Sequence, residues 1–244
     1  LLKKKYFVQP LSFLNLILAV LRDDPIIKQV LNAYNTEIVE KNLKTILLKI
    51  SQVPLFMEVL RVSPIANLEF ENLLIQIRKS ILLNIDKLNF DINFLKLTSV
   101  LAIQCFLNEF IYNEDEIETK TLQKVEKSVL NSLVSKKQPN FLEVAILASY
   151  RPLYKYNWHR KLLFPEELND LKKQQIDEVA EENFIKNNIN IFNNVTNHVS
   201  KKVKGQYESS PYPRWKYEAK ASVFPKTMND IVEDLNLKIK YQSI

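Results

Sequence analysis

The sequence predicts an all-α fold: an irregular multi-helix bundle with an extended strap, rich in proline and aromatic residues, near the C-terminus. Three observations support this prediction. Apolar residues recur every three or four positions along most of the chain, which is the spacing of one helix face. Cap residues, twice followed directly by proline, mark helix starts. No segment shows the sustained alternation of apolar and polar residues that a half-buried strand requires.

Several helices are expected before residue 90. Four leucines within residues 10–22 share one helix face. Asp24 and Ser63, each followed by proline, are predicted to cap two of the helices, and Thr36 is predicted to cap another. The expected helices cover residues 10–22, 25–34, 37–50, 54–62 and 64–88.

The helix expected at residues 92–112, capped by Asp91, is apolar on more than one face. A helix of this kind lies in the centre of a bundle rather than at its surface. Its apolar residues are Phe94, Leu95, Leu97, Val100, Leu101, Ile103, Phe106, Leu107 and Phe110. We therefore expect the other helices to pack around it.

The second half of the chain is predicted to surround this central helix. Residues 115–134 form a charged, amphipathic helix for the surface. Asn140 is expected to cap an apolar helix at 141–150, which ends at Arg151-Pro152, and an irregular aromatic segment follows at 154–165. Further helices are expected at 166–173, 180–186, 194–204 and 228–237. No fixed repeat is readable, so the span does not predict an ordinary tetratricopeptide array.

The predicted strap covers residues 205–225. Gly205 is the only glycine of the chain and can adopt a positive φ, so it can end the helix before it. Pro211 and Pro213 fix their own φ and favour extended backbone at the residues before them. The strap is therefore expected to be stiff and extended.

Aromatic residues give this strap the means to anchor on a surface. Tyr207, Tyr212 and Trp215 each combine a large apolar face with one polar atom, and Arg214 offers a planar fork for a carboxylate or a backbone carbonyl. The simpler interpretation is a well-packed linker, because such connections are common between packed elements.

The predicted organisation has three parts. Residues 1–204 form a helical domain, with possible subdivision near 90 and 154. Residues 205–225 form the strap, and residues 226–244 form a linker helix and the start of a further C-terminal domain. The chain begins without Met and stops at Tyr241-Gln242-Ser243-Ile244, where another strand could begin. We therefore expect it to be a piece of a longer protein.

Four segments carry a resemblance to a known family. They are Gln206-Tyr207-Glu208 with Pro211-Tyr212-Pro213-Arg214-Trp215, then Gln104-Cys105-Phe106-Leu107-Asn108-Glu109-Phe110-Ile111-Tyr112, then Ala148-Ser149-Tyr150-Arg151-Pro152-Leu153, then Gln175-Ile176-Asp177-Glu178-Val179-Ala180-Glu181-Glu182. Together and in their order along the chain, they resemble the region before the methyltransferase domain of large bacterial proteins that join tetratricopeptide repeats to a class I S-adenosylmethionine-dependent methyltransferase. Ser209-Ser210 and Val179 depart from the family pattern, which usually has Glu-Asn and Pro there.

The resemblance implies that the parent protein transfers a methyl group from S-adenosylmethionine. This span cannot hold that cofactor in a glycine-rich turn, because it has a single glycine. The cofactor is therefore expected in the C-terminal catalytic domain, and this span is expected to select substrate, cap the active site or dock the catalytic domain. Tyr207 and Arg214 are the candidates for contacting the cofactor, while Gln206, Tyr212 and Trp215 are candidates for interdomain contacts. The alternative is a helical scaffold that binds a protein partner and has no enzymatic neighbour.

A polar stripe interrupts the apolar helix expected at 92–112. Gln104 and Asn108 are four residues apart and share a face, and Glu109 follows directly. Buried polar groups need partners, which could be loop backbone, Tyr150 and Arg151, or the strap. The favoured interpretation is an internal hydrogen-bond network that locks the loops. In the sharper hypothesis, Glu109 and Arg151 or Arg214 line a pocket next to the catalytic domain.

Composition argues against several other functions. The single cysteine, Cys105, excludes a disulfide within the chain, is consistent with a reducing cytoplasm, and is expected to pack as a small apolar side chain. No Cys, His, Asp or Glu stands at metal-ligand spacing from His159 or His198, so no metal is expected. The net charge of +6 comes from scattered lysines, so a nucleic-acid interface is not expected. No apolar stretch approaches membrane-spanning length, so no membrane partner is expected.

Overall fold

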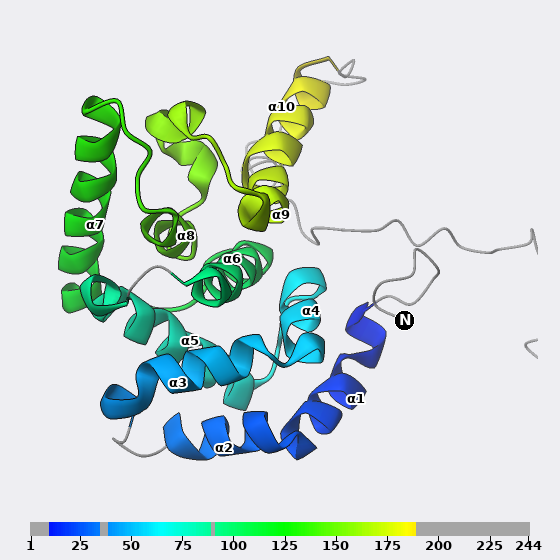
Figure 1. The fold of residues 1–244 in the computed structure, drawn as a ribbon. Coiled ribbons are helices and arrows are strands. Elements are labelled where there is room, and N and C mark those ends of the chain that lie inside the picture. The colour runs from blue at the N-terminus through cyan, green and yellow to red at the C-terminus, as the bar shows by residue number, and fades with distance from the viewer. Residues whose placement is uncertain (1–9, 35–38, 89–90, 189–244) are drawn as a thin grey trace, which may run out of the picture.

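The computed structural model describes residues 10–34, 39–88 and 91–188, and within these ranges the chain consists of helices and loops without a strand (Figure 1). The all-α prediction is therefore confirmed for this part of the chain. The strap at 205–225 and the helices expected at 194–204 and 228–237 lie outside the described residues.

The helices of the described ranges follow the predicted order closely. Those before residue 92 are α1 Pro10–Asp23, α2 Pro25–Tyr34, α3 Val39–Ser51, α4 Pro54–Val62, α5 Leu68–Leu83 and the 3-10 turn η1 Ile85–Lys87. The later ones are α6 Ile92–Leu107, α7 Glu116–Val134, α8 Phe141–Ala148, the 3-10 turns η2 Leu153–Lys155, η3 Asn157–Lys161 and η4 Glu166–Leu168, α9 Asn169–Lys172, the π-turn η5 Lys173–Asp177 and α10 Glu178–Asn188.

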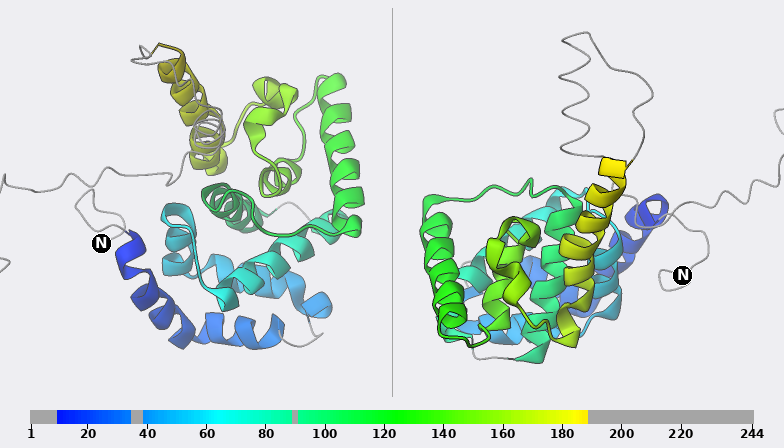
Figure 2. Two further views of the ribbon diagram at one scale, coloured as in Figure 1. Left: turned by 180° about the vertical axis from the view of Figure 1, so that it is seen from behind. Right: turned by 90° about the horizontal axis from the view of Figure 1, so that it is seen from above.

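Helix α6 lies in the middle of the fold, as its sequence predicts. It packs against α3, α4 and α5 on one side and against α8, α9 and η4 on the other (Figures 1 and 2). Every side chain from Leu97 to Leu107 is buried, and Lys96 is exposed. A helix buried all round has no solvent-facing stripe, so both groups of helices depend on it for their apolar contacts.

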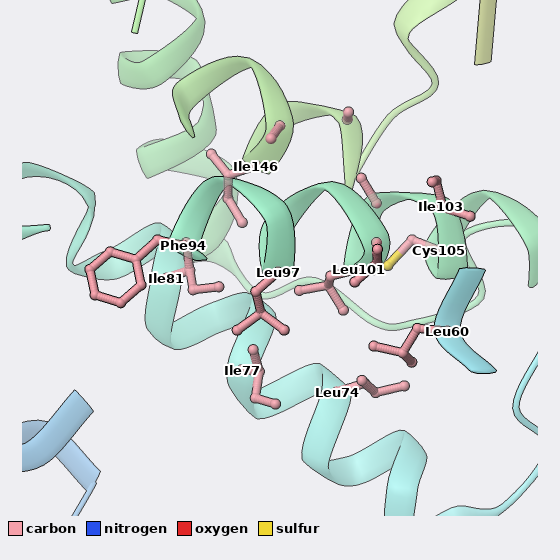
Figure 3. Close-up of a cluster of buried hydrophobic side chains, with 14 of the residues drawn as sticks. Leu60, Leu74, Ile77, Ile81, Phe94, Leu97, Leu101, Ile103, Cys105 and Ile146 are labelled. Carbon is pink, nitrogen blue, oxygen red and sulfur yellow. The ribbon is translucent and has the colours of Figure 1, made fainter. Parts of the chain in front are cut away.

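The contacts of α6 form the centre of one continuous apolar core. Leu97 and Leu101 lie over Ile77 and Leu74 of α5, with Leu60 of α4 beside them (Figure 3). From the opposite side, Ile146 of α8 approaches α6. These side chains are at most 2% exposed, so each contributes close to its full burial free energy, about 1.5–3 kcal/mol.

Three helix starts follow the predicted caps, since Asp24, Asp91 and Asn140 each accept a backbone N–H from the first turn of the helix that follows. Asp115, which was predicted to begin a helix but not to cap it, does the same. The predicted cap Thr36 lies outside the described residues. The capping box at Asp115 is reciprocal, since the carboxylate of Glu118 accepts the Asp115 N–H (3.0 Å). Two reciprocal hydrogen bonds between Asp115 and Glu118 therefore hold the first turn of α7.

The predicted cap at Ser63 is wrong. Ser63 ends α4, and α5 begins only at Leu68, where the side chain of Asn67 accepts the N–H of Phe70 (3.4 Å). Ser63 is buried, and its carbonyl oxygen accepts a long-range hydrogen bond from Gln104 that the local Ser-Pro signal could not reveal. The predicted continuation of this helix to Leu88 is also wrong, since α5 ends at Leu83.

Helix α6 ends five residues earlier than expected. Asn108 is its C-cap, and Glu109 and Phe110 both have positive φ, 58° and 57°. The N–H of Glu109 donates to Phe106 O (3.2 Å) and that of Phe110 to Cys105 O (2.8 Å), which is the Schellman pattern. The sequence hides this end because the left-handed position usually holds glycine, and here it holds glutamate.

Helix α7 ends in the same way at an exposed lysine. Lys136 has a φ of 56°, and Lys136 N and Lys137 N donate to Leu133 O (3.1 Å) and Ser132 O (2.9 Å). A non-glycine residue in the left-handed region costs about 1 kcal/mol or more. The C-terminal ends of α6 and α7 therefore both carry the cost of a left-handed backbone conformation at a non-glycine residue.

We expect Lys136→Gly to stabilise the protein by about 0.5–1 kcal/mol, because glycine removes the left-handed cost at the price of a more flexible unfolded chain. Urea denaturation measures the change. The matched control is Lys124→Gly in the middle of the same helix, where glycine should destabilise by about 1 kcal/mol. Equal destabilisation by both variants would contradict the strain at Lys136.

Candidate functional site: a buried arginine cluster and its loops

A fully buried arginine occupies the contact between α5, α6, α7 and the end of α8. Arg78 is 1% exposed. Its guanidinium carbon lies 3.9 Å from the ring centroid of Tyr150 and 5.7 Å from that of Tyr112, so two aromatic rings flank the charge. Its Nη2 donates to the carbonyl oxygen of Asn113 (2.6 Å). Arg78 therefore ties the α6–α7 loop to α5.

The negative partner of Arg78 is Glu118, which is 3% exposed. A carboxylate oxygen of Glu118 lies 3.8 Å from Arg78 Nη2, and the hydroxyl of Tyr150 donates to the same oxygen (2.5 Å). The other oxygen accepts the Asp115 N–H of the capping box. One buried carboxylate thus balances the arginine, orients Tyr150 and completes the start of α7.

Gln175 joins three more parts of the chain. It lies in the π-turn η5 and is fully buried. Its side-chain amide donates to Ala102 O and Ala148 O (3.1 Å each), and its oxygen accepts the Leu153 N–H (2.9 Å). A π-turn holds one extra residue per turn and so can aim a side chain where a regular helix would not. Gln175 thereby fixes the middle of α6 and the end of α8 to η5.

Gln104 makes the network that the polar stripe predicted. In the amide orientation that satisfies both of its groups, it donates to Ser63 O (2.8 Å) and Leu60 O (3.2 Å) and accepts from Ile65 N (2.8 Å). Ser63 and Ile65 belong to the loop between α4 and α5, and Leu60 belongs to the last turn of α4. The side chain is fully buried, so it serves as an internal lock for this loop.

The other predicted residues of the described part have distinct positions. Asn108 caps α6, and its side-chain oxygen accepts the N–H of Phe110 (3.1 Å). Glu109 occupies the left-handed position after that cap. Tyr150 is buried in the arginine cluster, whereas Arg151 is exposed and pairs with Glu114 (2.6 Å).

The remaining predicted site residues lie outside the described residues. They are Gln206, Tyr207, Tyr212, Arg214 and Trp215. The pocket hypothesis that includes Arg214 therefore stays a prediction.

Sequence reasoning missed Arg78 and Glu118. A signal was available for the arginine: it lies four residues after Leu74 and four before Leu82, on the buried stripe of α5. A charge at such a position indicates a buried pair or network, because an unpaired charge in a core is too costly. Glu118 was hidden because it also satisfies the local capping-box pattern.

Burial shapes the acid–base chemistry of the cluster. It raises the pKa of Cys105 to about 12, although the nearby charge of Arg78 acts in the opposite direction. Burial also raises the pKa of the phenols of Tyr112, Tyr150 and Tyr156 above the ordinary 10.0. A thiol and phenols of this kind stay protonated at neutral pH, which does not suit a nucleophile or a general base.

We expect these three phenols to ionise only when the protein unfolds. Since their folded pKa values are raised, the stability they contribute is complete below about pH 10 and is lost as pH rises above it. Alkaline titration followed by phenolate absorbance and by circular dichroism should show some of the tyrosines ionising together with unfolding. Tyr156→Phe should remove one phenol from that late step. If every tyrosine ionised while the protein was still folded, the burial of these three phenols would be contradicted.

The described surface has two clefts that the predicted site residues do not line. One, of about 320 Å³, lies between α4, α6 and η4 and is crossed by the ion pair of Arg61 with Asp170. The other, of about 640 Å³, lies beside α5 near Arg22. The Arg78 cluster is closed to solvent, so its chemistry is that of a structural lock.

Two further features concern ions and membranes. Among the described residues, no group of three or more His, Cys, Asp or Glu side chains is placed to hold a metal ion. His159 contacts the carbonyl oxygen of Tyr156 through Nδ1 (2.7 Å). Within the same ranges, none of the helices combines the length and the apolar character needed to cross a bilayer.

The fold and the cluster define an all-α domain organised around one buried helix and locked by buried polar side chains. Comparison with known proteins adds no family: no family model matches the chain, and neither the curated proteins nor the solved structures contain a match.

Proposed function

We propose that this chain is the non-catalytic helical domain of an S-adenosylmethionine-dependent methyltransferase, in which it selects substrate, caps the active site or docks a C-terminal catalytic domain. The observation that carries the proposal is the set of four sequence segments, ending in Pro211-Tyr212-Pro213-Arg214-Trp215, that resemble the region before such a domain. The single glycine supports a cofactor site in the catalytic domain rather than in this span, because the cofactor needs a glycine-rich turn that this span does not offer.

The packing of three of these segments supports the proposal. Tyr112 of the segment at 104–112 and Tyr150 of the segment at 148–153 flank the same guanidinium. Gln175, which begins the segment at 175–182, bonds to Ala148 and Leu153. Segments that are distant in sequence thus belong to one structural unit, and a shared structural role is a physical reason for them to occur together.

The test is titration of S-adenosylmethionine into this chain and into the same chain extended by the domain that follows it in the parent protein. We expect binding only to the extended protein, and weaker binding after Arg214→Ala, which removes the predicted carboxylate contact. Absence of binding to both proteins would overturn the proposal.

A helical scaffold for a protein partner is the second candidate. It is favoured by an apolar ridge on α1, where Phe13, Leu16 and Val20 are 43%, 62% and 53% exposed at helical spacing. Under this alternative, a partner isolated with the chain should lose affinity on Leu16→Asp, and no S-adenosylmethionine should bind to the extended protein.

A further inference from the structure

Helix α10 continues directly from α9 and η5 and buries little of its own surface. Val179 is its only buried side chain, and every side chain from Ala180 to Asn188 is exposed. Figures 1 and 2 show the helix extending away from the other helices. Helices shorter than about 12–15 residues are marginal in water, and most helical stability in proteins comes from packing of an apolar face. Residues 169–188 form one unbroken helical segment through α9, η5 and α10. The buried Leu171, Gln174 and Gln175 anchor its first half, so α10 is the half that gains most from a cover.

The apolar side chains that need covering are adjacent. Phe184 is 69% exposed and Ile185 is 49% exposed. Burying two such side chains is worth about 1.5–3 kcal/mol each. Helix α1 also exposes an apolar ridge, but it buries Leu14, Leu18 and Leu21 on its other face and is anchored without a cover. Of these two helices, α10 is therefore the one whose own length is less covered by packing.

We propose that the Phe184–Ile185 face of α10 is the docking site of the chain's own strap, residues 205–225, with the aromatic side chains of the strap covering the two apolar residues. Continuity of the chain supports this occupant. Sixteen residues separate Asn188 from Gly205, enough to span up to about 55 Å when fully extended, whereas α10 is only about 16 Å long. Because the strap belongs to the same chain as α10, its effective concentration near α10 is high, on the order of millimolar.

The chemistry of the two surfaces is complementary. The strap provides Tyr207, Tyr212 and Trp215, with the cations Arg214 and Lys216 beside the tryptophan. One turn before Phe184 and Ile185, α10 provides the carboxylates of Glu181 and Glu182. An apolar pair next to carboxylates and a segment of aromatics next to cations are complementary in chemistry. The prolines of the strap restrict its free conformations and lower the entropy lost on docking.

Tryptophan fluorescence tests the contact in the whole chain. The protein has two tryptophans, the buried Trp158 and Trp215, so Trp158→Phe leaves Trp215 as the only one. We expect its emission to be blue-shifted and weakly quenched by iodide. Adding Phe184→Asp should shift the emission to the red and increase quenching several-fold. The matched control is Leu163→Asp, at an apolar residue that is 75% exposed elsewhere, and it should change neither.

A second measurement does not depend on replacing Trp158. With Ile185→Cys and Tyr212→Cys, a short thiol cross-linker should join the two positions within one chain, while the buried Cys105 stays unmodified. Solvent-like Trp215 emission, an unchanged signal on Phe184→Asp, cross-linking only between chains, or emission that depends on protein concentration would each overturn the proposal. The contact does not require a methyltransferase domain, so failure of S-adenosylmethionine binding leaves this test unaffected.

Discussion

Replacing Arg78 with alanine is expected to lower the free energy of unfolding by about 3–5 kcal/mol, the usual cost of removing one partner from a buried charge pair. The variant leaves the carboxyl group of Glu118 enclosed without its cation, with Tyr150 as its remaining side-chain donor. It also removes the cation between the rings of Tyr112 and Tyr150 and frees the carbonyl of Asn113. Urea denaturation followed by circular dichroism measures the loss.

Two variants separate the buried charge from ordinary loss of packing. Arg78→Met combined with Glu118→Gln keeps both volumes and an acceptor for Tyr150 but removes both charges, so it should recover much of the stability lost in Arg78→Ala. Arg151→Ala breaks an ion pair whose arginine side chain is 52% exposed, and should cost less than about 1 kcal/mol. Similar effects of Arg78→Ala and Arg151→Ala would contradict the role assigned to the cluster.

Gln175→Ala is expected to cost about 2–4 kcal/mol, because it leaves a cavity and removes the buried partners of the Leu153 N–H and of two carbonyl oxygens. The loss should appear in the urea midpoint, and hydrogen exchange should increase around Ala102 in α6 and at the end of α8, which the amide holds together.

The neighbouring residue is a matched control. Gln174 is also buried, but its side-chain oxygen has no hydrogen-bond partner among the described residues. Gln174→Met should therefore change stability by less than about 1 kcal/mol, or increase it, because it removes a polar atom that gains nothing from burial. Equal losses at the two positions would show that burial alone, and not the hydrogen bonds of Gln175, decides the effect.

Local signals in the sequence predicted much of the fold. Helix starts at Asp24, Asp91, Asp115 and Asn140 depend on side chains two or three residues from the groups they cap, so they could be read directly. The central place of α6 followed from its apolar faces. The end of α6 could not be read, because Glu109 adopts a conformation that sequence patterns assign to glycine.

The candidate site was less predictable. The polar stripe correctly marked Gln104 as a residue that needs buried partners, but it did not say that they lie in the α4–α5 loop. Gln175 and Arg78 act on residues 22 or more positions away. Such contacts arise from the packing of distant segments, and no local pattern contains them.

The enclosure of α6 has a consequence for biosynthesis. A ribosome releases α1 to α5 well before it releases α8 and η5, which cover the other side of α6. Until the chain has emerged to about Gln175, one apolar side of α6 is uncovered in the growing polypeptide. Exposed apolar surface of this kind is prone to aggregation. We therefore expect slow translation or stalling between residues 107 and 175 to increase the demand of this protein for chaperones.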